Sequence, residues 1–124
     1  MTFSRASSEI RRLLEARDER NALRVVFQLV DDMRRALGDG REGFLELGPM
    51  PTGDRRFDAL LAGLAEHEAR EAGQSPPKWA TRLSVVLDPP WYVSPYLRAM
   101  AEVESPEPLR ARGILITAAD LTRV

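Results

Sequence analysis

The sequence predicts a mainly α protein, a small helical bundle followed by a proline- and aromatic-rich C-terminal section with room for one short strand pair. Apolar residues recur every three or four positions through most of the first 73 residues, the spacing of amphipathic helices. Five of the nine prolines and both tryptophans fall instead within residues 76–95. A chain of 124 residues has the size of one domain. We therefore expect a single unit with a helical core at about 7–73 and the C-terminal section at about 76–124.

The first predicted helix begins at Ser7 or Ser8 and ends near Arg17. Either serine can serve as its N-cap, because a side-chain oxygen there accepts from a free backbone N–H of the first turn. The second predicted helix runs from Asn21 to Leu37.

This second helix carries more apolar surface than one buried face needs. We expect it to be buried around much of its circumference, with Gly38 ending it. The alternative interpretation is that part of this surface forms the interface of a homodimer. Eight of its 17 residues are large and apolar: Leu23, Val25, Val26, Phe27, Leu29, Val30, Met33 and Leu37.

The third predicted helix runs from about Asp54 to Ala72, with Thr52 or Asp54 as its cap. Gly73 and the two prolines at 76–77 end it. The glycine-rich stretch before it, residues 38–53, is predicted as a loop with at most a short helical turn at 42–47.

The C-terminal section is predicted to hold short elements separated by prolines. We expect helices at 78–83 and 96–103, and a third that starts at Ser105 and Pro106 and ends at Gly113. Residues 114–116 are predicted as a strand, and Thr117 caps a final turn. The apolar run 85–87 fits a strand or a buried helical turn equally well.

The charge balance gives no sign of nucleic-acid binding. Lysine and arginine total 18 against 19 aspartates and glutamates, for a net charge of −1, whereas nucleic-acid-binding domains concentrate positive charge. All basic residues but Lys78 are arginine, a bias typical of GC-rich genomes. The alternative interpretation is recognition of phosphate or carboxylate groups, for which the planar guanidinium is well suited.

Cysteine is absent, which excludes disulfides and thiolate chemistry. No apolar run approaches the roughly 18 residues of a membrane span, and the polar N-terminus does not resemble a secretory signal. We therefore expect a cytoplasmic protein without membrane association.

No complete catalytic constellation is visible, so we expect a protein that is not an enzyme and needs no cofactor. His67 is the only histidine, and no nucleophile motif or phosphate-binding loop accompanies it. Asp54, Asp58 and His67 are weak candidates for a metal site on the third helix. The favoured interpretation is that both aspartates balance the helix dipole. The alternative function is a small metal- or nucleotide-binding domain, or an enzyme, that uses this face.

The C-terminal aromatic residues suggest a partner-binding surface, because tryptophan and tyrosine dominate interface energetics. The alternative is that they close the core over the third helix. Nearby arginines would pair with acidic groups of the partner. The candidate partner-binding residues are Trp79, Trp91, Tyr92, Tyr96, Arg55, Arg56 and Arg112.

The segments PTGDRRFDALLAGLAEHEAREAG, SPPKWATR, WYVSPY and RARGILITAADLTRV resemble a family of small uncharacterised actinobacterial proteins. The resemblance covers about residues 20–124 and departs from the family pattern at Glu68, where an aliphatic residue is usual. Its members are often encoded beside nucleotidyltransferase-type toxins or fused to a helix-turn-helix domain, which this chain lacks. The resemblance implies an antitoxin-like protein that masks such a toxin by steric occlusion. A structural homodimer subunit is the other alternative.

Overall fold

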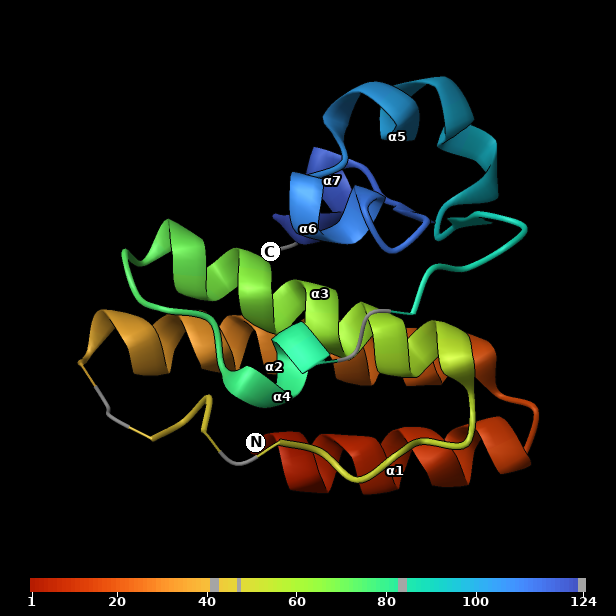
Figure 1. The fold of residues 1–124 in the computed structure, drawn as a ribbon. Coiled ribbons are helices and arrows are strands. Elements are labelled where there is room, and N and C mark those ends of the chain that lie inside the picture. The colour runs from red at the N-terminus through yellow and green to blue at the C-terminus, as the bar shows by residue number, and fades with distance from the viewer. Residues whose placement is uncertain (41–42, 47, 83–84, 123–124) are drawn as a thin grey trace.

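The computed structural model describes residues 1–40, 43–46, 48–82 and 85–122, and it confirms the mainly α class. Figure 1 shows α2 (Glu19–Gly38) between α1 (Phe3–Glu15) and α3 (Arg55–Glu71), with α5 (Arg98–Glu104), α6 (Glu107–Arg110) and α7 (Ala118–Leu121) on the far side of α3. A two-stranded parallel sheet is the only sheet in the described part of the chain. The elements are α1 (Phe3–Glu15), α2 (Glu19–Gly38), α3 (Arg55–Glu71), α4 (Lys78–Arg82), β1 (Trp91–Tyr92), the 3-10 helix η1 (Pro95–Leu97), α5 (Arg98–Glu104), α6 (Glu107–Arg110), β2 (Ile114–Leu115) and α7 (Ala118–Leu121).

Helix α1 begins four residues earlier than the sequence predicted. The N-cap is Thr2, whose side chain accepts a hydrogen bond from the Arg5 backbone N–H. Ser7 is instead buried inside the helix and donates to the Ser4 carbonyl, so the prediction of Ser7 or Ser8 as the cap was wrong. Burial of Phe3 explains the early start, because it extends the apolar face by one turn.

Helix α2 is longer than predicted at both ends. Asp18 caps its start and accepts from the Asn21 backbone N–H, so Asn21 lies inside the first turn. At the other end Gly38 is still helical, and the glycine with positive φ is Gly40, at +69°. The prediction that Gly38 ends the helix was therefore wrong, because Gly38 is its last helical residue and Gly40, two positions later, takes the left-handed conformation after the C-cap Asp39.

Helix α3 matches its prediction closely. Asp54 is its N-cap, and Gly73 follows its end with a φ of +71°, a conformation that glycine adopts without steric cost. The helix is buried along most of its length because other helices cover it on several sides. On the C-terminal side the contact is very close: a Cβ atom at Gly63 would lie 2.6 Å from Leu109 Cδ2.

The C-terminal section contains the short strand pair for which the sequence left room, with one strand at the predicted position and its partner at a position that was not predicted. Ile114 and Leu115 pair in parallel with Trp91 and Tyr92, a strand too short to leave an alternating pattern. Helix α4 falls within its predicted range, and the predicted last residue of that helix, 83, lies outside the described residues. Residues 85–87 form neither strand nor helix. Of the predicted turn at 42–47, positions 42 and 47 are likewise outside the described residues.

Helices α6 and α7 differ in how well their caps were predicted. Pro106 is the N-cap of α6, and the buried Ser105 hydroxyl instead donates to the Ala101 and Ile116 carbonyls. The prediction of Ser105 as cap was therefore wrong. Thr117 caps α7 as predicted, accepting from the Asp120 backbone N–H.

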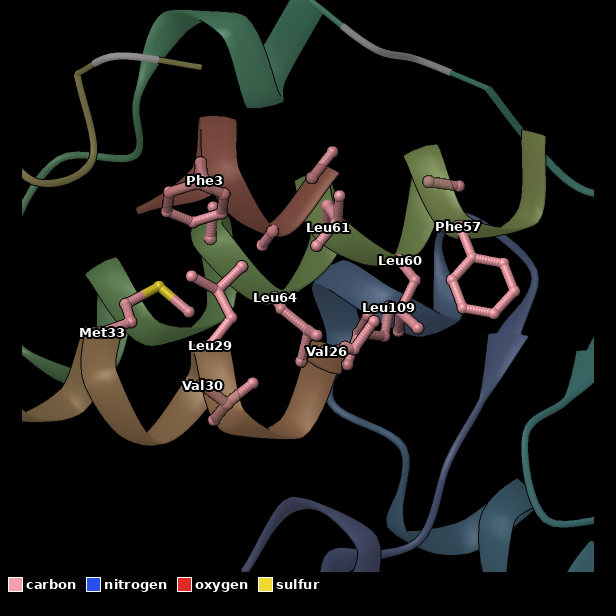
Figure 2. Close-up of a cluster of buried hydrophobic side chains, with 14 of the residues drawn as sticks. Phe3, Val26, Leu29, Val30, Met33, Phe57, Leu60, Leu61, Leu64 and Leu109 are labelled. Carbon is pink, nitrogen blue, oxygen red and sulfur yellow. The ribbon is translucent and has the colours of Figure 1, made fainter. Parts of the chain in front are cut away.

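The core lies between α1, α2 and α3 and continues to α6 and β2. Figure 2 shows α2 and α3 side chains interleaved, with Leu109 of α6 closing one end. The largest fully buried side chains are Phe3, Phe57, Ile10, Leu29, Met33, Leu60, Leu61, Leu64, Leu109, Ile114, Ile116 and Val26.

Most of the apolar surface of α2 is buried in this core. Leu23, Val25 and Leu37 are only partly buried but pack against it, and the other five large apolar residues of the helix are buried. Among the described residues, none of the exposed large apolar side chains belongs to α2. The helix therefore lacks the free apolar face that the homodimer interpretation required. In the same residues, no helix has the length and apolar character needed to cross a membrane.

Candidate functional site

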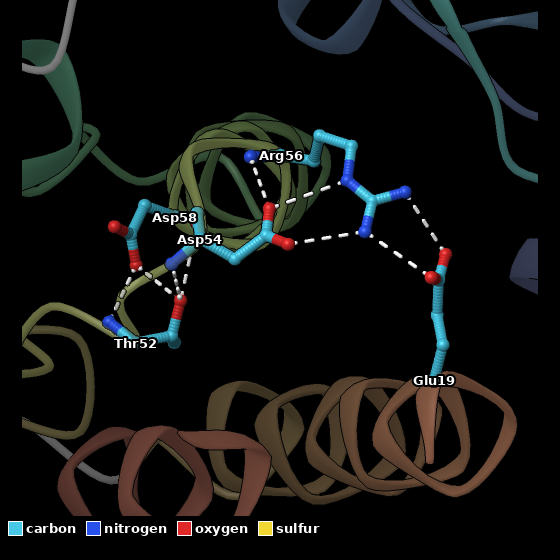
Figure 3. A network of polar contacts seen from close by, with 5 residues as sticks. All are labelled: Glu19, Thr52, Asp54, Arg56 and Asp58. Carbon is cyan, nitrogen blue, oxygen red and sulfur yellow. Dashed lines mark hydrogen bonds and ion pairs between the residues drawn. The ribbon is translucent and has the colours of Figure 1, made fainter. Parts of the chain in front are cut away.

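The predicted aspartates at the start of α3 are occupied by structural bonds. Figure 3 shows Asp54 and Asp58 pointing to different partners. Asp58 Oδ1 accepts from the backbone N–H and the hydroxyl of Thr52, each at 2.8 Å. Asp54 Oδ1 accepts from the Arg56 backbone N–H at 2.8 Å, which is the capping bond of the helix. These contacts favour the interpretation of both residues as helix-start acids.

Arg56 links the start of α3 to the start of α2. Its guanidinium donates to both carboxylate oxygens of Glu19, at 3.0 and 3.2 Å, and to Asp54 Oδ2 at 3.0 Å (Figure 3). Partial burial raises the pKa of Asp54, but hydrogen bonds and the positive charge of Arg56 outweigh it and leave that pKa below its ordinary value. Two carboxylates therefore neutralise the Arg56 charge within the chain.

His67 is too far along α3 to join Asp54 and Asp58. His67 lies nine positions after Asp58 on the helix, a rise of roughly 13.5 Å. No group of three or more potential ligand side chains in the described residues could hold a metal ion. The structure thus separates the three weak metal candidates into a capping network at one end of the helix and a lone histidine toward the other.

Two of the predicted partner-binding residues form contacts within the fold, the partly buried Trp79 and the buried Arg112. Trp79 donates its indole N–H to the Leu45 carbonyl at 2.6 Å, and its ring packs edge-on against Phe3 at 5.1 Å. A Cβ atom at Gly48 would lie 2.6 Å from the Trp79 ring, so the loop passes directly over it. Trp79 therefore fastens the loop before α3 to α1.

Arg112 is the second internal residue. Its guanidinium is buried and donates to the Pro108 carbonyl at 2.7 Å, the Ala80 carbonyl at 2.8 Å and Glu66 Oε1 at 3.2 Å. These bonds join α6, α4 and α3. Arg112 therefore holds the C-terminal section on the helical core.

Arg55, Arg56 and Trp91 line a shallow hollow of about 320 Å³ beside the prolines 89–90. The Arg56 guanidinium lies 5.0 Å from the Trp91 ring, which also packs against Phe57 at 5.3 Å. Trp91 is half-buried by these contacts. Arg55 is exposed. Its guanidinium has no hydrogen bond or ion pair with any described residue, whereas that of Arg56 is paired with Glu19 and Asp54.

Tyr92 and Tyr96 have different surroundings although both were predicted to bind a partner. Tyr92 donates its hydroxyl to Glu102 at 2.6 Å, and this bond, with a minor contribution from burial, raises its pKa. The Arg98 guanidinium lies 4.8 Å from the Tyr92 ring. Tyr96 is 97% exposed and contributes nothing to the core.

Tyr96 belongs to the most exposed apolar feature of the described surface, which we call the α5 ridge. It consists of Tyr96, Leu97, Met100 and Val103, with exposed fractions of 97%, 38%, 45% and 80%. Met100 and Val103 are three positions apart in α5 and share one side of it, whereas Tyr96 and Leu97 belong to the preceding 3-10 helix η1. Figure 1 places α5 on the side of the molecule farthest from α1. The sequence predicted Tyr96 as a partner-binding residue and a helix at 96–103, but α5 begins only at Arg98 and Tyr96 lies in η1, so no single helical spacing indicated the ridge.

A cavity of about 700 Å³ lies where α2 and α3 end beside α5 and α7. We call it the carboxylate cavity. Its titratable lining residues are Arg34, His67, Glu68, Glu71 and Glu104, and its apolar walls include Leu37 and Leu121. Glu104 is the last residue of α5, so the cavity and the α5 ridge adjoin.

Comparison with protein-family models, with curated proteins and with solved structures finds no match for this chain. The resemblance to actinobacterial antitoxin-like proteins therefore stays a prediction. Three surface features of the described structure are candidates for a functional role: the α5 ridge, the carboxylate cavity and the hollow beside Trp91.

Proposed function

We propose that this protein is a protein-interaction module that binds its partner through the α5 ridge. The observation that carries the proposal is the exposure of Met100 and Val103 on α5, together with Tyr96 on the 3-10 helix η1 that directly precedes it. Grouped exposed apolar side chains on a soluble domain are typical of interaction sites, whereas single ones are ordinary. Tyrosine and methionine are also enriched in interfaces.

The ridge is held in place before any partner binds. Arg110 donates to the carbonyls of Glu102 and Val103, at 3.1 and 3.2 Å, which satisfies free carbonyl groups at the end of α5. Ala101 is fully buried beneath the helix, and the Tyr92 hydroxyl bonds to Glu102. A preformed surface loses less conformational entropy on binding than a disordered one.

This proposal leaves Trp79 and Arg112 out of the interface and keeps Tyr96 at its centre. Arg55, Arg56 and Trp91 remain a second candidate contact on another part of the surface. The partner implied by the family resemblance is a nucleotidyltransferase-type toxin, which this module would mask as an antitoxin does. A module that acts by occlusion needs no catalytic residues of its own.

The test is affinity purification of tagged protein from its native host, with mass spectrometry of stoichiometric partners. Val103→Glu and Met100→Lys should each lower recovery of the partner at least tenfold, because a charge is placed in a desolvated contact. Val86→Glu and Met50→Lys are matched controls, since those side chains are 63% and 69% exposed but lie outside the ridge.

Equal recovery with the ridge variants and the control variants would contradict the proposal. Recovery of a nucleotidyltransferase would identify the toxin-masking case. A toxicity-rescue assay with the same four variants would then test masking directly.

A further inference from the structure

The carboxylate cavity carries more negative than positive charge. Its lining contains three glutamates against one arginine, and that arginine, Arg34, is already paired with Glu68 and also donates to the Leu121 carbonyl at 2.6 Å. Glu68 is buried, so this pair is part of the fold. The carboxylates of Glu71 and Glu104 remain, and both residues are exposed.

Neither remaining carboxylate has a positively charged partner within the described residues. Glu104 accepts only a backbone N–H, from Ala118 at 3.0 Å. Glu71 forms no side-chain hydrogen bond or ion pair in that part of the chain. The walls beside them are apolar, from Leu37, Leu121 and Pro106. Such a site suits a cationic head on an aliphatic stem, which is the chemistry of a lysine or arginine side chain.

The position of the cavity connects it to the α5 ridge. Glu104 lines the cavity and follows Val103 of the ridge directly in α5. A segment lying along the ridge can therefore place a side chain beside Glu104.

We infer that the carboxylate cavity receives a lysine or arginine side chain of the partner, between Glu71 and Glu104, while apolar residues of the same partner segment cover the α5 ridge. This inference rests on the proposed function and specifies the partner's chemistry, an amphipathic segment with a basic residue beside its apolar face. The complementary charges fix the orientation of the segment on the ridge.

The cavity can be tested without the partner, with hexylammonium as the probe. His67 lines the cavity and is the only histidine of the chain, so the NMR signal of its ring Hε1 proton can be assigned without ambiguity. The titration is run at pH 8, at which an alkylamine carries a positive charge as a lysine side chain does. We expect hexylammonium to shift the His67 signal saturably, and uncharged hexanol at equal concentration to give no saturable shift.

The matched variants are Glu71→Gln with Glu104→Gln, compared with Glu15→Gln on α1. Glutamine keeps an oxygen for the Ala118 N–H and removes only the charge. We expect the double variant to weaken hexylammonium binding at least tenfold, and Glu15→Gln to leave it unchanged. Equal binding of hexanol, or an unchanged affinity in the double variant, would overturn the inference.

Two further variants separate the possible failures. Val103→Glu should lose the partner but still bind hexylammonium. Hexylammonium binding therefore tests the cavity even if partner recovery shows that the ridge is not the binding surface. The double glutamine variant should also lower partner recovery, and unchanged recovery would overturn this inference without affecting the proposed function.

Arg123 follows the cavity residue Thr122 in the sequence and lies outside the described residues. Hexylammonium binding that occurs only in Arg123→Ala would identify the chain's own arginine as the occupant and overturn the partner assignment.

Discussion

The buried guanidinium of Arg112 lies 3.2 Å from the carboxylate of Glu66, and this ion pair joins the C-terminal section to the central helix α3. Arg70 binds the other oxygen of Glu66 at 2.9 Å and extends to Glu107 at 2.8 Å. The C-terminal section that carries the α5 ridge is thus attached to the core by charged contacts as well as by the packing of Leu109.

Replacing Arg112 by methionine should destabilise the protein by about 3 kcal/mol, since breaking a buried ion pair leaves the other charge poorly compensated. The Pro108 and Ala80 carbonyls would also lose their donor. Urea denaturation followed by circular dichroism measures the change in the free energy of unfolding. The control is Arg55→Met, an exposed position at which a change within about 0.5 kcal/mol is expected. Equal effects at the two positions would show that Arg112 is not a structural anchor.

The glycine at position 63 should resist substitution although it lies within a helix. Gly63→Ala gains about 1 kcal/mol of helix propensity, but its Cβ would lie 2.6 Å from Leu109 Cδ2 in a fully buried contact. Overpacking of this kind costs about 1–3 kcal/mol, so we expect net destabilisation. Gly38→Ala is the matched control, because the residue is helical and no neighbouring side chain lies within 4 Å of the position that its Cβ would take. It should be neutral or stabilising by up to about 1 kcal/mol, and thermal unfolding of both variants tests the difference.

Asp54 should contribute to the acid sensitivity of the fold. Its pKa in the folded protein lies below the ordinary value of 3.8, so its ionised form adds stability that is fully present above pH 3.8. That stability is lost as the pH falls through the lower folded-state pKa. Asp54→Asn keeps a good N-cap and removes the charge. We therefore expect this variant to be less stable than the parent protein at pH 6, and the difference to shrink as the pH falls below 3.8.

Denaturant titrations at pH 6, 4 and 3 measure this convergence. Asp31→Asn, at an exposed position of α2, controls for the change in net charge. A stability difference between parent and Asp54→Asn that stays constant over this range would contradict the role given to the Asp54–Arg56 bond.

The ridge should be dispensable for folding. Val103 is 80% exposed, so Val103→Glu should change the free energy of unfolding by no more than about 0.5 kcal/mol. Leu109→Glu, in contrast, would place a charge in the core and should prevent folding. Thermal unfolding of Val103→Glu tests this expectation. A large loss of stability would mean that the ridge supports the fold, which would undermine its assignment to partner binding.

Long helices were predictable from this sequence, whereas the surface was not. The apolar spacing of α2 and the cap and terminating glycine of α3 are local signals, and local signals identify elements well. The start of α1 was misplaced because Phe3 gains its helical position from burial against Trp79 and Phe44, which are distant in sequence. The strand at Trp91 was missed because its pairing with Ile114 is nonlocal.

The candidate site shows the same division. The sequence identifies aromatic residues and arginines by type, but burial decides which of them are free. Trp79 and Arg112 have bonding partners more than 30 residues away, which no spacing pattern reveals. The carboxylate cavity combines residues of α2, α3, α5 and α7, so it exists only in the folded chain.

Photo-crosslinking in the native host can show whether the α5 ridge contacts a partner protein. A benzophenone amino acid would replace Val103 in one strain and the exposed control residue Val86 in another. We predict a discrete covalent adduct with one partner protein at position 103 and none at position 86. Absence of an adduct at 103, or the same adducts at both positions, would contradict the account.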